Sequence, residues 1–149
     1  MSIKSQLLSD ITSAMREKNQ KKLSALRLMS SAIKQIEVDE RIEVEDDRAI
    51  IIFDKLVKQR QESIQQFKAA GRDELVAQEE FELALIRHYL PEPLAPDAVT
   101  AMIDEAIAST NAKQISDMGK VMGLLKPKMQ GRVDMSQVSR LIKERLSHP

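Results

Sequence analysis

The sequence predicts an all-α fold, on grounds of composition and of hydrophobic spacing. Its 149 residues include only four glycines, three phenylalanines and one tyrosine, and no tryptophan or cysteine. Alanine, leucine, glutamate, lysine, glutamine and methionine, which favour helices over strands, are plentiful. Apolar residues recur at steps of three and four along most of the chain, which is the spacing of amphipathic helices. We therefore expect helices that bury one face each.

Four helices are expected in residues 1–90. The first begins after an N-cap at Ser2, and its apolar stripe extends to Met15. A polar run then interrupts the pattern. The second helix carries apolar residues at steps of three and four from Leu23 and runs to about Arg41. The two helices are predicted to pack through their apolar faces.

The third and fourth helices have clear end signals. Acids at 45–47 lie in what reads as the first turn of the third helix, where the helix dipole favours negative charge. Its apolar seam contains one charge, Arg60, interpreted as a snorkelling or ion-paired structural residue. Gly71 is expected to end this helix and Asp73 to cap the next. Prolines from Pro91 onward stop the fourth helix.

A proline-rich segment marks the predicted domain boundary. Pro91, Pro93 and Pro96 fall within six residues, which indicates a linker, and Pro96 suits the first position of a following helix. We place a bundle of about four helices at 1–92 and a small three-helix domain at 93–149.

Two more helices are expected in the C-terminal domain. One begins at Ser116 or Asp117 and is bent or stopped by Pro127. The last follows a capping box formed by Asp134 and Gln137. No internal repeat or low-complexity tract is visible.

Several classes of site are excluded by composition. The absence of cysteine excludes disulfides, thiol nucleophiles and cysteine-bound zinc, and only His88 and His148 remain as imidazoles. We therefore expect no metal, no cofactor and no catalytic residue. No run approaches the ~18 apolar residues of a membrane span, so we expect a soluble, cytoplasmic protein that does not enter a membrane.

The neutral overall charge hides an asymmetry along the sequence. Residues 111–149 carry eight basic and three acidic side chains, a formal charge of +5, which leaves −5 for residues 1–110. Such an asymmetry favours an anionic partner for the basic end. An ordinary solvated face of lysines and arginines is the alternative.

The densest candidate site lies in residues 118–134. Gly119 and Gly123 are four apart on one helical face, which permits tight helix packing or the close approach of a partner. Basic residues surround a turn at Pro127 and Gly131, whose free amides would precede a helix N-terminus and could hold phosphate oxygens. The candidate phosphate-binding residues are Lys120, Lys126, Lys128, Arg132, Arg140 and Lys143.

Several stretches resemble one protein family. They are Leu26-Arg27-Leu28 with Ala32-Ile33-Lys34, VKQRQESIQQFKAAGR at 57–72, YLPEPL at 89–94 and DMGKVMGLLKPKMQGRVD at 117–134. In this order and spacing the chain resembles the YqeY-like proteins of the GatB/YqeY family over essentially its whole length. It departs from them at Ala95, where the family commonly has a serine-type cap.

This resemblance implies a fold and a function. It implies an all-helical protein of two parts, similar to the C-terminal tail of the B subunit of the glutamine-dependent aspartyl/glutamyl-tRNA amidotransferase, which grips the tRNA body. The leading hypothesis is therefore a noncatalytic module that binds tRNA or another structured RNA. A tRNA-dependent amidase, or a carbon–nitrogen ligase with glutamine as amido-N-donor or an accessory to it, is one alternative. A protein-interaction module that uses Gly119 and Gly123 is the other.

Overall fold

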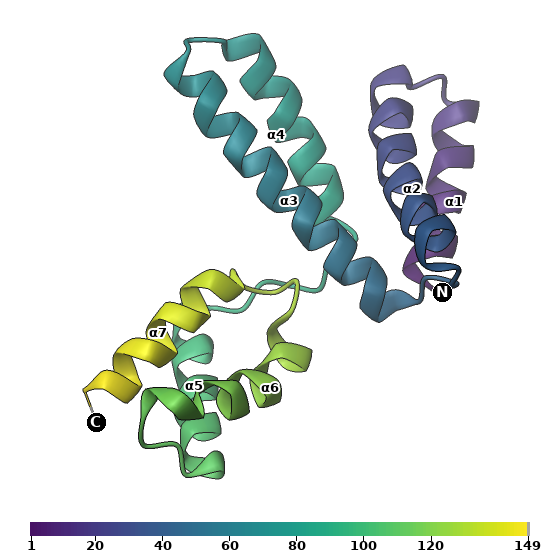
Figure 1. Cartoon of the computed structure of the whole chain (residues 1–149). Coiled ribbons are helices and arrows are strands. Elements are labelled where there is room, and N and C mark those ends of the chain that lie inside the picture. Colours follow the sequence, from purple (N-terminus) through teal and green to yellow (C-terminus); the bar gives the residue numbers. More distant parts are fainter. Residues whose placement is uncertain (149) are drawn as a thin grey trace. The chain divides into compact units, whose positions relative to one another are not determined.

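Helices and their connections make up the whole of residues 1–148, which are the residues that the computed structural model describes. The all-α prediction is confirmed. The chain divides into two units, Met1–Leu90 and Pro91–Pro149, each with its own hydrophobic core (Figure 1).

The N-terminal unit consists of two helical hairpins, which Figure 1 shows as the pairs α1·α2 and α3·α4. The hairpins meet through contacts of α3 with α1 and α2, and of α4 with α2. The helices are α1 (Ile3–Arg16), α2 (Gln20–Glu40), α3 (Asp46–Ala69) and α4 (Asp73–Arg87).

The ends of these helices follow the predicted signals with one shift. The Ser2 hydroxyl accepts a hydrogen bond from the Ser5 amide at 3.1 Å, so the predicted N-cap of α1 is confirmed. Gly71 ends α3 with a φ of +69°, which glycine adopts without the steric cost of a Cβ. The prediction of Asp73 as a cap is wrong, because Arg72 is the N-cap of α4 and Asp73 is its first residue. Three residues, Ala70, Gly71 and Arg72, separate α3 from α4.

The core of the N-terminal unit lies where the two hairpins meet. Phe53 of α3 and Leu26 of α2 are completely buried, and the Tyr89 ring packs edge-on against Phe53 with ring centroids 6.0 Å apart. The Tyr89 hydroxyl donates a hydrogen bond to the Asp10 carboxylate. This bond ties the end of α4 to α1 across 79 residues of sequence.

Arg60 is an ion-paired structural residue, which is the second of the two interpretations given for it from the sequence. Its Nε lies 3.0 Å from Glu82 Oε2 and 3.7 Å from Glu79 Oε2, so it joins α3 to α4. Burial, and then the charge of Glu82, raise the pKa of Glu79, while Arg60 lowers it. Glu82 therefore accepts the hydrogen bond from Arg60 that joins the two helices, whereas Glu79 Oε2 is buried without a hydrogen bond among the described residues.

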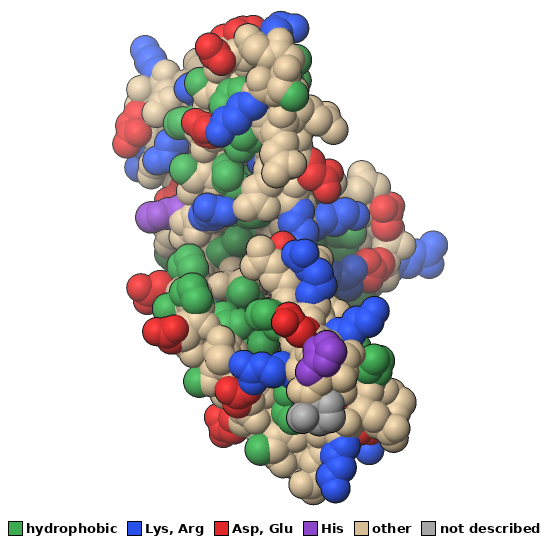
Figure 2. All heavy atoms as spheres, turned by 90° about the vertical axis from the view of Figure 1, so that its left-hand side faces the viewer, with side chains coloured by type: hydrophobic (Ala, Val, Ile, Leu, Met, Phe, Trp, Pro, Cys, Tyr) green, Lys and Arg blue, Asp and Glu red, His purple; other side chains and the backbone are tan. Residues whose placement is uncertain are grey.

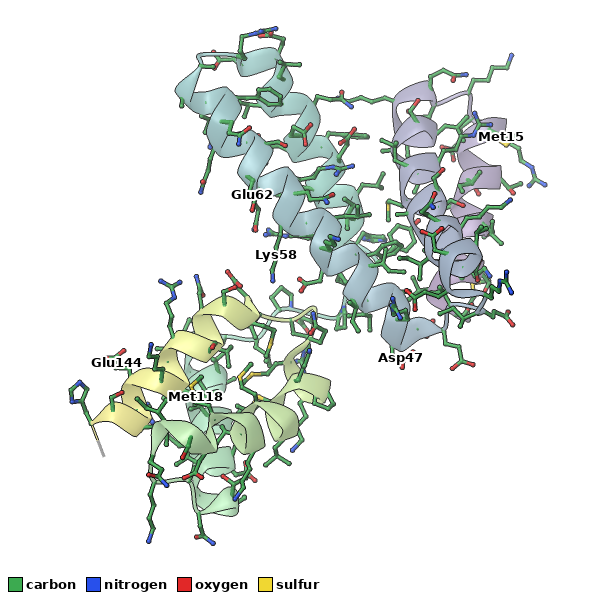
Figure 3. All side chains as sticks on the ribbon, in the orientation of Figure 1. Met15, Asp47, Lys58, Glu62, Met118 and Glu144 are labelled. Carbon is green, nitrogen blue, oxygen red and sulfur yellow. The ribbon has the colours of Figure 1, made fainter. Side chains whose placement is uncertain are left out.

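The predicted apolar stripe of α1 is only partly correct. Leu7 and Ala14 are buried, whereas Leu8 and Met15 are each 53% exposed. Met15 projects from the side of α1 that faces away from α2 (Figure 3). Only one side of α1 meets other helices. Its buried face is therefore narrower than the spacing of its apolar residues predicts.

Three α-helices and one short 3₁₀ turn form the C-terminal unit: α5 (Pro96–Thr110), η1 (Ile115–Asp117), α6 (Met118–Met129) and α7 (Met135–Ser147). Their apolar faces meet in one core. Its buried residues are Val99, Ile103, Ala106, Ala112, Val121, Leu125, Met129, Val138, Ile142 and Leu146.

Pro127 does not stop α6, which continues to Met129. A proline in a helix removes the donor for the carbonyl four residues earlier, which here belongs to Gly123. Both residues are exposed, so water can take the place of the missing amide. At the other end, the Asp117 carboxylate accepts hydrogen bonds from the amides of Lys113 and Gln114, which lower its pKa.

The bond between Tyr89 and Asp10 predicts a dependence of stability on pH. Burial and the neighbouring Asp10 raise the pKa of the phenol above its ordinary value of ~10. A pKa raised by folding stabilises the fold fully below the unfolded pKa, and this stabilisation is lost as the pH rises through the folded pKa. Because the chain has one tyrosine, phenolate absorbance reports on Tyr89 alone. We expect phenolate to form at higher pH in the folded protein than in urea; equal midpoints would contradict the account.

Tyr89→Phe tests the same bond at neutral pH. The substitution removes the hydroxyl and leaves the ring against Phe53, so we expect a loss of ~1–3 kcal/mol in the free energy of unfolding, measured by urea denaturation. Asp10→Asn keeps an acceptor and should cost less. A Tyr89→Phe variant as stable as the wild type would show that the bond contributes nothing.

Candidate functional site

The exposed side of α6 is basic. Val121, Leu125 and Met129 follow one another at steps of four and are at most 2% exposed, so they fix which side of the helix faces the core. Lys120, Lys126 and Lys128 lie outside this buried strip and are all exposed. The helix contains no acidic residue. Lys126 and Lys128 form no ion pair with any residue in the described range 1–148.

The two glycines of α6 do not serve helix packing inside the chain. Gly119 and Gly123 are exposed, and a Cβ atom built on either of them meets no described atom within 4 Å. Of the two interpretations of the sequence, tight packing within the chain is therefore wrong. Each glycine costs the helix ~1 kcal/mol relative to alanine. The structure leaves their face of α6 open to solvent.

The turn between α6 and α7 differs from the expected cradle of free amides. The amides of Gln130 and Arg132 donate to the carbonyls of Lys126 and Met129, at 3.0 and 2.9 Å. At the N-terminus of α7 the Asp134 carboxylate accepts from the Ser136 amide at 2.9 Å. A phosphate at this helix end would meet a carboxylate, so the predicted anion site at these amides is wrong. The reason is that Asp134 itself caps the helix.

Arg132 has a structural contact that the sequence did not reveal. Its Nε donates to the Glu92 carbonyl at 2.9 Å, and its own carbonyl accepts from the Leu94 amide at 2.9 Å. Glu92 and Leu94 are therefore partners of the candidate site that sequence reasoning missed. The only available signal was the proline-rich segment, whose prolines leave few amides for regular structure.

The remaining candidates lie on α7. Arg140 and Lys143 are exposed, and neither takes part in an ion pair among the described residues. Arg145, on the same helix, forms an ion pair with Asp104 of α5. The outer side of α7 also carries Glu144, labelled in Figure 3. The basic residues of α7 thus share their helix with one acidic residue, whereas α6 has none.

The charge asymmetry of the sequence is not an asymmetry between the folded units. Residues from Pro91 onward carry eight basic and seven acidic side chains, and residues 1–90 carry fifteen and sixteen. The segment that leads into α5 and α5 itself belong to the same unit as α6. All their charged residues are acidic: Glu92, Asp97, Asp104 and Glu105. Figure 2 accordingly shows blue and red side chains interspersed on the face it presents. The positive charge is local to α6 and parts of α7.

A shallow groove runs between α5 and α6. It has a volume of about 180 Å³ and is lined by Met102, Glu105, Ala106, Ser109, Leu124, Leu125 and Lys128. Leu124 is 39% exposed at its edge. The groove offers an apolar contact beside the basic face of α6.

The described residues, 1–148, contain neither a cluster of metal ligands nor a helix suited to span a membrane. No group of three or more histidine, cysteine, aspartate or glutamate side chains could hold a metal ion. Among the helices in the same range, none combines the length and the apolar character needed to cross a membrane.

Comparison with known proteins decides the family. The sequence matches the family described as Yqey-like protein over residues 4–146. The chain belongs to this family. The match includes both units of the structure, and it confirms the family resemblance seen in the sequence.

Curated relatives bear the name "Altered inheritance of mitochondria protein 41, mitochondrial". The one from Saccharomyces cerevisiae (strain YJM789) is 37% identical over 87 residues, 58% of this chain and 47% of the relative. The relative from Eremothecium gossypii is 40% identical over 85 residues, which are 56% of this chain and 46% of the relative. The relative from Lachancea thermotolerans is 31% identical over 121 residues, which are 76% of this chain and 65% of the relative. The chain spans about half the length of the first two relatives.

These names correct one expectation from the sequence. The sequence predicts a cytoplasmic protein, on the ground that it has no apolar run as long as a membrane span. The relatives are named as mitochondrial proteins, which contradicts this expectation. The cytoplasmic prediction is therefore wrong. An absent apolar segment is uninformative here, because mitochondrial targeting segments are amphipathic rather than continuously apolar.

The open space around Gly123 predicts a stabilising substitution. Gly123→Ala should raise the free energy of unfolding by ~0.5–1 kcal/mol, because alanine favours the helix and its Cβ meets no neighbour. Gly71→Ala is the control, since its φ of +69° should make alanine destabilising by ~1–2 kcal/mol. Urea denaturation of both variants measures the difference. A destabilised Gly123→Ala variant would show that α6 has close neighbours at this position.

Proposed function

We propose that the C-terminal unit binds tRNA or another structured RNA through phosphate contacts, without catalysing a reaction. The observation that supports this proposal best is the basic exposed side of α6. Lys120, Lys126 and Lys128 lie on a helix without an acid, and the last two have no ion-pair partner in residues 1–148. Unpaired lysines on a helix surface are suited to contact phosphate oxygens as point charges.

The charge of the whole unit limits the extent of such a contact. Eight basic and seven acidic residues give the unit almost no net field, so long-range attraction of RNA would be weak. The contact is therefore proposed for α6, with Arg140 and Lys143 of α7 as additional phosphate ligands. The acidic helix α5 would repel phosphates and so restrict the orientations in which RNA can bind.

The unit would recognise the shape and backbone of RNA rather than its bases. All four aromatic residues, Phe53, Phe67, Phe81 and Tyr89, lie in the N-terminal unit. Proteins that bind single-stranded nucleic acid commonly stack bases on aromatic side chains. A unit without them is better suited to a folded RNA, where the phosphates have a fixed arrangement.

Membership of the YqeY-like family adds support, because the resemblance found in the sequence implies a likeness to the tRNA-gripping tail of the amidotransferase B subunit. The enzymatic alternative predicts release of ammonia from glutamine, or amidation of a mischarged tRNA, by the purified protein. The protein-interaction alternative is favoured by one observation, the apolar groove beside Leu124. A partner protein that remains bound after nuclease treatment would support that alternative.

The salt dependence of tRNA binding tests the proposal. We expect affinity to fall steeply between low and physiological salt, because each phosphate contact releases counterions. The slope of the logarithm of affinity against the logarithm of salt concentration should become shallower by about two in Lys126→Ala/Lys128→Ala. Each lysine that no longer meets a phosphate accounts for about one. Fluorescence anisotropy with labelled tRNA measures both quantities.

A matched variant controls for the general reduction in charge. Lys34→Ala/Lys55→Ala removes two exposed lysines from the N-terminal unit and should leave affinity and slope near those of the wild type. No binding by the wild type at low salt would refute the proposal. An equal effect of both double variants would refute the assignment to α6.

A further inference from the structure

Hydrogen bonds to Arg132, together with the packing of Leu94 against the core, hold the segment that leads into α5. In residues 91–95, Pro91 and Pro93 have no amide hydrogen to donate. Ala95 is the N-cap of α5 and makes no side-chain capping bond. The two bonds that reach this segment from the α6–α7 turn both involve Arg132, one through its side chain and one through its backbone. We call this pair of bonds the Arg132 clamp.

The clamp leaves most of the guanidinium available. Arginine has five N–H donors in a planar fork, and the clamp uses the one on Nε. Arg132 is partly exposed and forms no ion pair among residues 1–148. Because the bond to the Glu92 carbonyl restrains the guanidinium at Nε, it limits the orientations of the terminal amino groups. A fork held in this way can bind two oxygens of one phosphate group with little loss of entropy.

We propose that Arg132 binds a phosphate through the terminal amino groups of its side chain, away from the turn amides, and couples this binding to the order of residues 91–95. This inference rests on the proposed RNA binding. A phosphate held by the terminal amino groups restrains the guanidinium, and the restrained guanidinium holds the Glu92 carbonyl. Such coupling is reciprocal: a closed clamp favours phosphate binding, and bound phosphate favours the closed clamp.

Hydrogen exchange of the Leu94 amide measures the state of the clamp, because this amide donates to the Arg132 carbonyl. Without RNA, Arg132→Met should make this amide exchange roughly two- to tenfold faster, since the substitution removes one hydrogen bond that holds the segment. With tRNA bound, the wild-type amide should exchange more slowly than without it. Lys126→Met is the matched control: it also removes one charge, and without RNA it should leave Leu94 exchange unchanged.

The outcomes separate this inference from the proposed function. If the wild type binds tRNA and Leu94 exchange does not change, or if Arg132→Met without RNA leaves exchange unchanged, the coupling is refuted and RNA binding stands. If the wild type binds no tRNA, the proposed function and the coupling both fail, and the RNA-free arm then reports on the clamp alone. Arg132→Lys keeps the charge but not the planar fork of N–H donors, and it serves as the second variant if Arg132→Met does not fold. It should also weaken tRNA binding.

Discussion

The burial of one side of α6 determines what the C-terminal unit can present to a partner. Val121, Leu125 and Met129 are at most 2% exposed, and each apolar side chain buried in this way contributes ~1.5–3 kcal/mol. This burial fixes the rotation of the helix about its axis. The same three side chains therefore place the lysines and both glycines of α6 in solvent, so that the core of the unit and its candidate binding surface are two sides of one helix.

Charge and backbone bonding restrict how this surface can act. The acids of α5 cancel most of the positive charge of α6 and α7, so an anionic partner is attracted only where it meets α6 directly. Asp134 occupies the N-terminus of α7 and removes the anion site that the sequence suggested there. Arg132 connects the basic turn to the segment before α5, which has few donors of its own. Recognition would thus depend on a small number of positioned cations rather than on a broad electrostatic field.

Helix positions could be predicted from the sequence where a local signal decides them. Ser2 and Gly71 act as expected, because capping and a left-handed turn depend on neighbouring residues alone. Contacts between distant segments could not be predicted: the bond of Arg132 to Glu92 joins residues 40 apart, and that of Tyr89 to Asp10 joins residues 79 apart. The charge of the basic end was misjudged for another reason. The count began at residue 111 and left out the acids of α5, although the predicted domain begins at residue 93.

The most direct measurement of the central claim is an NMR titration of the protein with tRNA, followed through its backbone amides. If the basic side of α6 is the contact, amide shifts should change most at Gly119, Gly123, Lys126 and Lys128, and little on the acidic helix α5. Changes concentrated in residues 1–90, or spread evenly over both units, would contradict the account.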